Sequence, residues 1–186
     1  VPFRATISIS GLPPARSRVR CTHPVSAMSH YTFSATFRAV YDRATARFAH
    51  GDATPANLLA ADDVAFLAAN GITSGHIFDY VDDLAGYGEP SFDQAHGIEL
   101  VRRDYFHNAQ DARPSTVLLD PATLPAKTDS VRGIGWLPRL LPKAHAKLRG
   151  ELPPQLMYGC GGDRAFFKQH DILPHEFLNL VWRFED

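Results

Sequence analysis

Apolar residues recur every three or four positions through most of this chain, and this spacing restricts the fold to helices that pack on one another. The first such stripe consists of Phe33, Phe37, Val40, Tyr41, Ala44 and Phe48. At this spacing the side chains lie along one face of an α-helix, and that face must be buried against another element. We therefore expect a mainly α fold.

Start and stop signals divide the pattern into about seven helices. The predicted helices begin near Tyr31, Leu58, Ser74, Ser91, Trp136, Asp163 and Pro174. Ser91 is a good N-cap, and Pro174 suits a first helical turn. Gly51, the pair Asn70-Gly71 and Gly150 follow apolar stripes, where glycine commonly ends a helix.

The helices are expected to form two packed lobes, residues 31–108 and residues 130–186, with a linker at 109–129. In the linker, Val117-Leu118-Leu119 is a short apolar run between prolines, so at most one short strand is expected. Residues 1–30 contain no Asp or Glu, four Arg and four Pro, and no period. We interpret them as a spurious or disordered extension, with Met28 as a translation start.

The formal net charge of −1 conceals a division along the chain. Between Arg47 and Arg102 there is no Lys or Arg but nine Asp and Glu, whereas residues 130–150 carry five basic residues and no acid. One interpretation is an acidic half packed beside a basic half, and the other is an anion site on the basic part. The negative total argues against nucleic acid as a partner.

Composition and missing motifs exclude several classes of protein. No apolar run reaches the ~18 residues of a membrane-spanning helix. Two cysteines, Cys21 and Cys160, are too few for a disulfide framework, so we expect a soluble, cytoplasmic protein without a membrane partner. The chain lacks a phosphate loop, a dinucleotide-binding glycine motif, HExxH, GxSxG and CxxC. No reaction or cofactor is therefore indicated.

The feature closest to chemistry is the turn Tyr158-Gly159-Cys160-Gly161-Gly162-Asp163-Arg164. A glycine-rich turn that runs into a helix leaves backbone N–H groups free to bind an anion, and Arg164 could add a bidentate contact. The same field favours a thiolate at Cys160. Against this, Asp163 at the N-cap would occupy those amides itself, and the glycines would then serve only a tight turn.

A basic row, Arg139, Lys143 and Lys147, lies at i, i+4 and i+8 on the helix that begins at Trp136. It is either a ligand-binding face or a solvated face paired with the acidic half. Our candidate catalytic residues are Cys160 and Asp163. The candidate binding residues are Trp136, Arg139, Lys143, Gly161, Gly162 and Arg164.

Two further patterns are interpreted structurally. His76, Asp79 and Asp83 share one helix face, with His96 and Glu99 on a later helix, but this spacing is not that of helical-bundle metal sites, so no metal is predicted. Aromatic residues of the last third could line a pocket, although core packing is the simpler interpretation. They are Trp136, Phe166, Phe167, Phe177 and Trp182.

The last third resembles a bacterial family catalogued as domain of unknown function 5069. The matching text is Gly135-Trp136-Leu137-Pro138-Arg139, Lys143-Ala144, Leu148, Gly150, Tyr158, Cys160, Asp163, Phe166-Phe167 and Phe177-Leu178, within roughly residues 130–184. Upstream, Tyr80-Val81-Asp82-Asp83, Gly88-Glu89-Pro90 and Arg102-Arg103-Asp104-Tyr105-Phe106 resemble longer relatives. The resemblance implies a bacterial protein with a compact helical fold, and it supplies no reaction.

Two functions from different classes follow as hypotheses. The first is a small-molecule-binding protein or enzyme whose anionic ligand sits at the turn from Gly159 to Arg164. The second is a non-catalytic module that docks a protein partner through the acidic first half or through the basic helix at residues 137–149.

Overall fold

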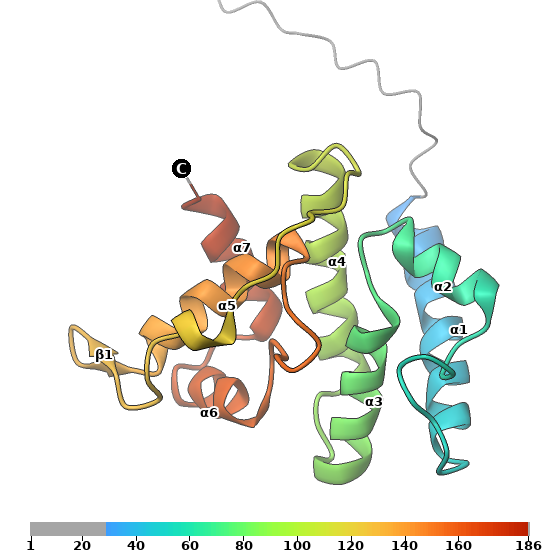
Figure 1. Cartoon of the computed structure of the whole chain (residues 1–186), viewed down its shortest axis with the longest axis horizontal. Helices are drawn as coiled ribbons and strands as arrows, with labels where there is room; N and C mark the ends of the chain where they lie inside the picture. The colour runs from blue at the N-terminus through green and yellow to red at the C-terminus, as the bar shows by residue number, and fades with distance from the viewer. Residues whose placement is uncertain (1–28, 186) are drawn as a thin grey trace, which may run out of the picture.

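The computed structural model describes residues 29–185, and our interpretation of residues 1–30 therefore falls almost entirely outside the described part. In this part the chain forms seven α-helices and one two-stranded hairpin, so the expected mainly α fold is confirmed (Figure 1). The helices are α1 (His30–Phe48), α2 (Ala61–Ala68), α3 (Ser74–Tyr87), α4 (Phe92–Asn108), α5 (Leu137–Arg149), α6 (Gly161–Gln169) and α7 (Pro174–Arg183).

Local signals explain most of the helix boundaries. The Ser91 hydroxyl accepts the backbone N–H of Gln94, and the Gln94 side chain accepts the N–H of Ser91, which makes a complete capping box at the start of α4. Gly88 and Gly150 have left-handed backbone conformations at the C-caps of α3 and α5. Cap chemistry that is visible in the sequence therefore fixes these ends.

Helix α4 lies at the centre of the arrangement. It packs against α1 on one side and against α5 and α7 on the other, and α1 also packs against α3. Figure 1 shows α1, α2 and α3 on one side of α4 and α5, α6 and α7 on the other. The cleft described below lies between these two groups of helices.

The core is continuous across both groups. Phe33, Phe37 and Val40 of α1 are fully buried, and so are Ile98 of α4 and Leu140 of α5. Phe166, Phe167 and Phe177 are buried and pack edge to face or tilted against one another, as core aromatic rings do. Burial of this apolar surface is the main stabilising contribution to the fold.

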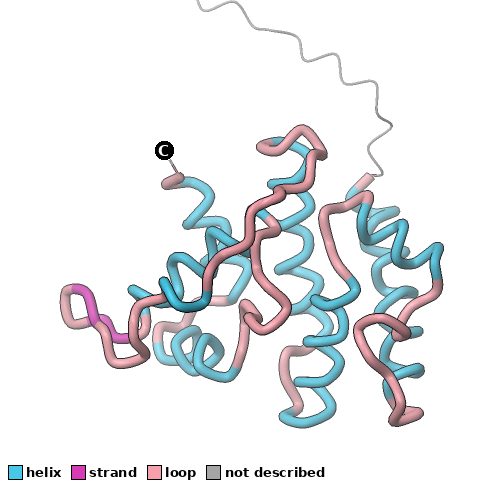
Figure 2. The backbone as a smooth tube through the Cα atoms, viewed as in Figure 1, coloured by secondary structure: helices cyan, strands magenta, loops and turns pink. Residues whose placement is uncertain are grey.

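The linker, residues 109–129, contains no strand, which agrees with the expectation of at most one short strand there. Residues 117–119 form no strand, and Val117 and Leu118 are exposed. The two strands are β1 (Ser130–Val131) and β2 (Ile134–Gly135), which pair antiparallel just before α5 (Figure 2). The linker is nevertheless attached, because the N–H of Leu119 donates to the carbonyl of Glu151, and a 3-10 turn, η1 (Pro121–Thr123), follows.

Within residues 29–185, no helix is long and apolar enough to cross a membrane.

Candidate functional site

A cleft of about 610 Å³ is lined by residues of α3, α5 and α6. It brings together every predicted binding residue, Trp136, Arg139, Lys143, Gly161, Gly162 and Arg164, and also Cys160. Asp163 does not line the cleft and is completely buried. Residues of three helices that are far apart in the chain therefore meet in one place, and α6 lies beside the start of α5.

Helix α6 begins at Gly161, two residues earlier than predicted, and its N-cap is Cys160 rather than Asp163. The Cys160 side chain makes no capping hydrogen bond. The first amide with a helical partner is that of Arg164, which donates to the carbonyl of Cys160 at 2.9 Å. Among the described residues, none accepts a hydrogen bond from the N–H groups of Gly161, Gly162 or Asp163.

Asp163 does not cap α6 as predicted but accepts hydrogen bonds from other segments. Its Oδ1 accepts the indole N–H of Trp136 at 2.9 Å, and its Oδ2 accepts the backbone N–H of Gly159 at 2.9 Å and Lys143 Nζ at 2.5 Å. These three donors come from outside α6. The N–H groups of Gly161 and Gly162, which line the cleft, are therefore not occupied by Asp163.

Lys143 is almost completely buried but still lines the cleft. Besides Asp163, its Nζ donates to Cys160 Sγ at 3.2 Å. An ammonium group has three N–H donors, so one remains for a bound molecule. The ion pair with Asp163 balances the charge that burial would otherwise make costly.

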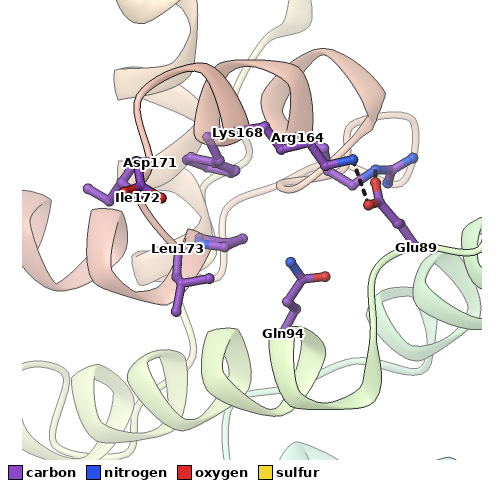
Figure 3. A pocket seen from close by; sticks show the side chains of 9 residues that line it. Glu89, Gln94, Arg164, Lys168, Asp171, Ile172 and Leu173 are labelled. Carbon is purple, nitrogen blue, oxygen red and sulfur yellow. Dashed lines mark ion pairs between the residues drawn. The ribbon is translucent and has the colours of Figure 1, made fainter.

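Arg164 lines the cleft, but its charge is already engaged. Nη1 donates to Asp83 Oδ2 at 2.6 Å and to the carbonyl of Gly159 at 2.8 Å, and Nε lies 3.4 Å from Glu89. Glu89 pairs with both Arg164 and Lys168 and lines a smaller pocket of about 170 Å³. Figure 3 shows these two ion pairs as dashed lines. Arg164 therefore ties α6 to α3 and shares its charge with two carboxylates, and its bidentate contact with an anion stays a prediction.

Trp136 is held in a backbone conformation that is rare for a bulky residue, with φ of 66°. Its indole packs directly over Gly162, where a Cβ atom would come within 2.2 Å of the ring. The hydrogen bond to Asp163 fixes the other edge of the ring. Such strain persists only where the surroundings enforce it, and here they hold the indole beside the α6 N-terminus.

Four charged side chains of the cleft have no ion-pair partner within residues 29–185. Asp79 and Asp82 project from α3, Lys127 comes from the linker, and Arg139 comes from α5, where its Nη1 donates to the carbonyl of Pro125. Burial raises the pKa of Asp79 to about 6, with Asp82 and Asp83 adding to the rise and Lys147 opposing it.

Helices α3, α4 and α5 meet at a buried polar cluster. Glu99 Oε1 accepts Lys147 Nζ at 2.6 Å and the Tyr80 hydroxyl at 2.7 Å, and Lys147 Nζ also donates to His76 Nδ1 at 3.1 Å. Burial lowers the pKa of Lys147, although Glu99 opposes this. Burial would raise the pKa of Glu99, but Lys147, His76 and the hydrogen bonds lower it.

This cluster corrects the interpretation of the basic row as a solvated face. Lys143 and Lys147 are both buried. Lys147 does pair with the acidic half, as predicted, but inside the protein. No three His, Cys, Asp or Glu side chains converge on a metal-sized site in the described part of the chain.

Sequence reasoning missed Lys127 and the segment Gln155-Leu156-Met157, which also line the cleft. No local signal marks them, because both lie in irregular segments whose course depends on tertiary contacts. Asp79 and Asp83 were singled out by their helical spacing, but for a metal rather than for this cleft.

Comparison of the chain with protein-family models, with curated proteins and with solved structures finds no match. The resemblance to the family of unknown function stays a prediction.

Proposed function

We propose that the cleft binds a small molecule through an anionic group at the first turn of α6. The observation that carries this proposal is that the N–H groups of Gly161, Gly162 and Asp163 have no acceptor among residues 29–185, while the two glycines line the cleft. Unpaired first-turn amides form the positive end of a helix dipole and accommodate anionic oxygens.

Two side chains add positive charge at the same place. Arg139 uses one nitrogen for a carbonyl and keeps its other donors for a fork-like contact with a carboxylate, sulfonate or phosphate group. Lys143 keeps one N–H. Asp163 does not compete for the amides, because its oxygens accept donors from other segments.

The size and lining of the cleft favour a small ligand. Its volume of about 610 Å³ falls within the roughly 300–1,000 Å³ of small-molecule sites. Trp136, Leu156 and Met157 provide apolar surface beside the charged groups. Cys160 Sγ lies in the same cleft, so a bound molecule would meet a thiol, and alkylation of that thiol can report binding.

The proposal is tested by the charge preference of Cys160 alkylation. The measured quantity is the rate of alkylation by iodoacetate divided by the rate of alkylation by uncharged iodoacetamide. In a Cys21→Ser background, we expect this ratio to be higher at Cys160 than at a small free thiol, because the site attracts anions. Arg139→Gln should lower this preference by about threefold. Sulfate should slow both reactions, when compared with chloride at equal ionic strength.

Arg113→Gln is the matched control, because Arg113 is exposed and does not line the cleft. It should leave the iodoacetate preference unchanged. Equal effects of the two arginine substitutions, or no protection by sulfate, would refute the proposal.

The second hypothesis, a protein-docking module, stays a prediction for the acidic half. For the basic helix it loses its main support, because Lys143 and Lys147 are buried and cannot present their charge to a partner.

A further inference from the structure

The charges in the cleft do not cancel locally. Two pairs are closed within the protein, Arg164 with Asp83 at 2.6 Å and Lys143 with Asp163 at 2.5 Å. The other four charged groups of the lining are two acids, Asp79 and Asp82, and two bases, Lys127 and Arg139. The two acids and the two bases carry equal and opposite total charge, but they do not pair with one another.

These acids and bases face one cavity without touching. No ion pair within 4.0 Å joins either acid to either base in the described structure, although all four line the same 610 Å³. The acids come from α3, and Arg139 comes from α5 beside the first turn of α6. The cleft therefore has an acidic wall on α3 and a cationic wall formed by Arg139, Lys127 and the α6 N-terminus.

Asp79 is the better placed of the two acids to recognise a ligand. It is partly buried and accepts no hydrogen bond from any described residue, so its carboxylate has lost part of its hydration without gaining a partner. Lys147, a buried base whose charge acts on Asp79, is already paired with Glu99 at 2.6 Å. A cationic group in the cleft would supply the missing partner.

We infer that the ligand is zwitterionic, with its anionic group at the first turn of α6 and a cationic group, such as a primary ammonium, at the Asp79 and Asp82 wall. This inference rests on the proposed anion site and adds the second half of the recognition. Small amino acids and aminoalkyl sulfonates or phosphates share this chemistry.

A matched pair of probes separates the two halves. Taurine and isethionate carry the same sulfonate on the same two-carbon chain and differ by an ammonium group in place of a hydroxyl. In the full chain with Cys21→Ser, the concentration that half protects Cys160 from iodoacetamide at pH 7.5 should be about fivefold lower for taurine.

The double variant Asp79→Asn/Asp82→Asn should remove this difference and leave isethionate protecting at least as well as before. Asp62→Asn/Asp93→Asn is the control, because both residues are exposed acids outside the cleft. Circular dichroism checks that each variant is folded.

Each outcome decides between the two proposals. Equal protection by taurine and isethionate would overturn the zwitterion inference while the anion site stands. A taurine preference that survives in the Asp79→Asn/Asp82→Asn variant would overturn it as well, since the ammonium group would then bind elsewhere. Protection by neither probe would overturn both the inference and the proposed anion site.

Discussion

At the residue scale, one buried carboxylate organises the candidate site. Asp163 holds the indole of Trp136, the ammonium group of Lys143 and the amide of Gly159. Gly162 provides the space into which the indole fits. Trp136 and Lys143, which both line the cleft, are therefore held in place before any ligand arrives, and this reduces the entropy lost on binding.

Gly162→Ala tests this packing directly. The new methyl group would meet the Trp136 ring at 2.2 Å, so the indole must move and the hydrogen bond to Asp163 must lengthen. We expect a loss of about 1–3 kcal/mol in the free energy of unfolding, measured by urea denaturation. The fluorescence of Trp136 should change as well.

Gly161→Ala is the internal control for that substitution. A methyl group there would have only Arg164 Nη2 within 4 Å, at 3.9 Å. Both alanines change intrinsic helix propensity at the start of α6, so their difference isolates the contact with Trp136. Equal stability of the two variants would contradict the packing described here.

At the element scale, periodicity located the helices but not the environment of α5. Helical spacing placed all seven helices, because that signal is local, although the cap predicted for α6 was wrong. Lys143 and Lys147 have the same spacing as an ordinary solvated stripe, and their burial depends on Asp163 and Glu99, which lie 20 and 48 residues away. The cleft also depends on contacts between residues that are distant in the sequence, since its two walls come from distant segments.

The contact between α4 and α5 can be tested by a double-mutant cycle. Lys147→Met leaves Glu99 buried with only the Tyr80 hydroxyl as a close donor, so we expect a loss of about 3–5 kcal/mol. Adding Glu99→Gln removes the uncompensated charge and should recover part of that loss. Urea denaturation of the four proteins gives the coupling energy, and strictly additive losses would show that the pair does not stabilise the interface.

His76 makes the junction of α3, α4 and α5 sensitive to pH. Burial, together with repulsion from Lys147 and Arg102, lowers the pKa of His76 to about 3, and Glu99 opposes this shift. Because the pKa is depressed on folding, the unfolded chain takes up a proton first as the pH falls below 6.5. Stability is therefore present above pH 6.5 and is lost towards pH 3.

From pH 7 to pH 5, this single group should cost about 2 kcal/mol in the free energy of unfolding. The side chain in His76→Gln keeps an acceptor for Lys147 but does not titrate. Between pH 7 and pH 5, the free energy of unfolding of this variant should therefore fall by about 2 kcal/mol less than that of the unmodified chain. His50→Gln, at an exposed position, is the control. An identical pH profile for His76→Gln and the unmodified chain would show that His76 is not the sensitive group.

At the scale of the whole molecule, α4 belongs to both groups of helices. It packs against α1 and against α5 and α7, and the cluster around Glu99 joins it to α3 and α5. Arg102 of α4 also donates to the carbonyl of Leu148 at 2.8 Å. Separation of the predicted lobes, 31–108 and 130–186, would expose this buried ionic cluster to water and would separate Glu99 from Lys147.

We therefore expect the described part of the chain to unfold in one cooperative step. Trp136 and Trp182 both lie in the second predicted lobe, so tryptophan fluorescence reports on that lobe, whereas far-ultraviolet circular dichroism reports on helices of both. In urea, the two signals should give the same midpoint and the same slope, which is the test of a two-state transition. A circular dichroism curve with two steps, only one of which coincides with the fluorescence change, would mean that the lobes fold independently. The cleft would then lie between separate domains, and ligand binding would change the stability of the contact between them.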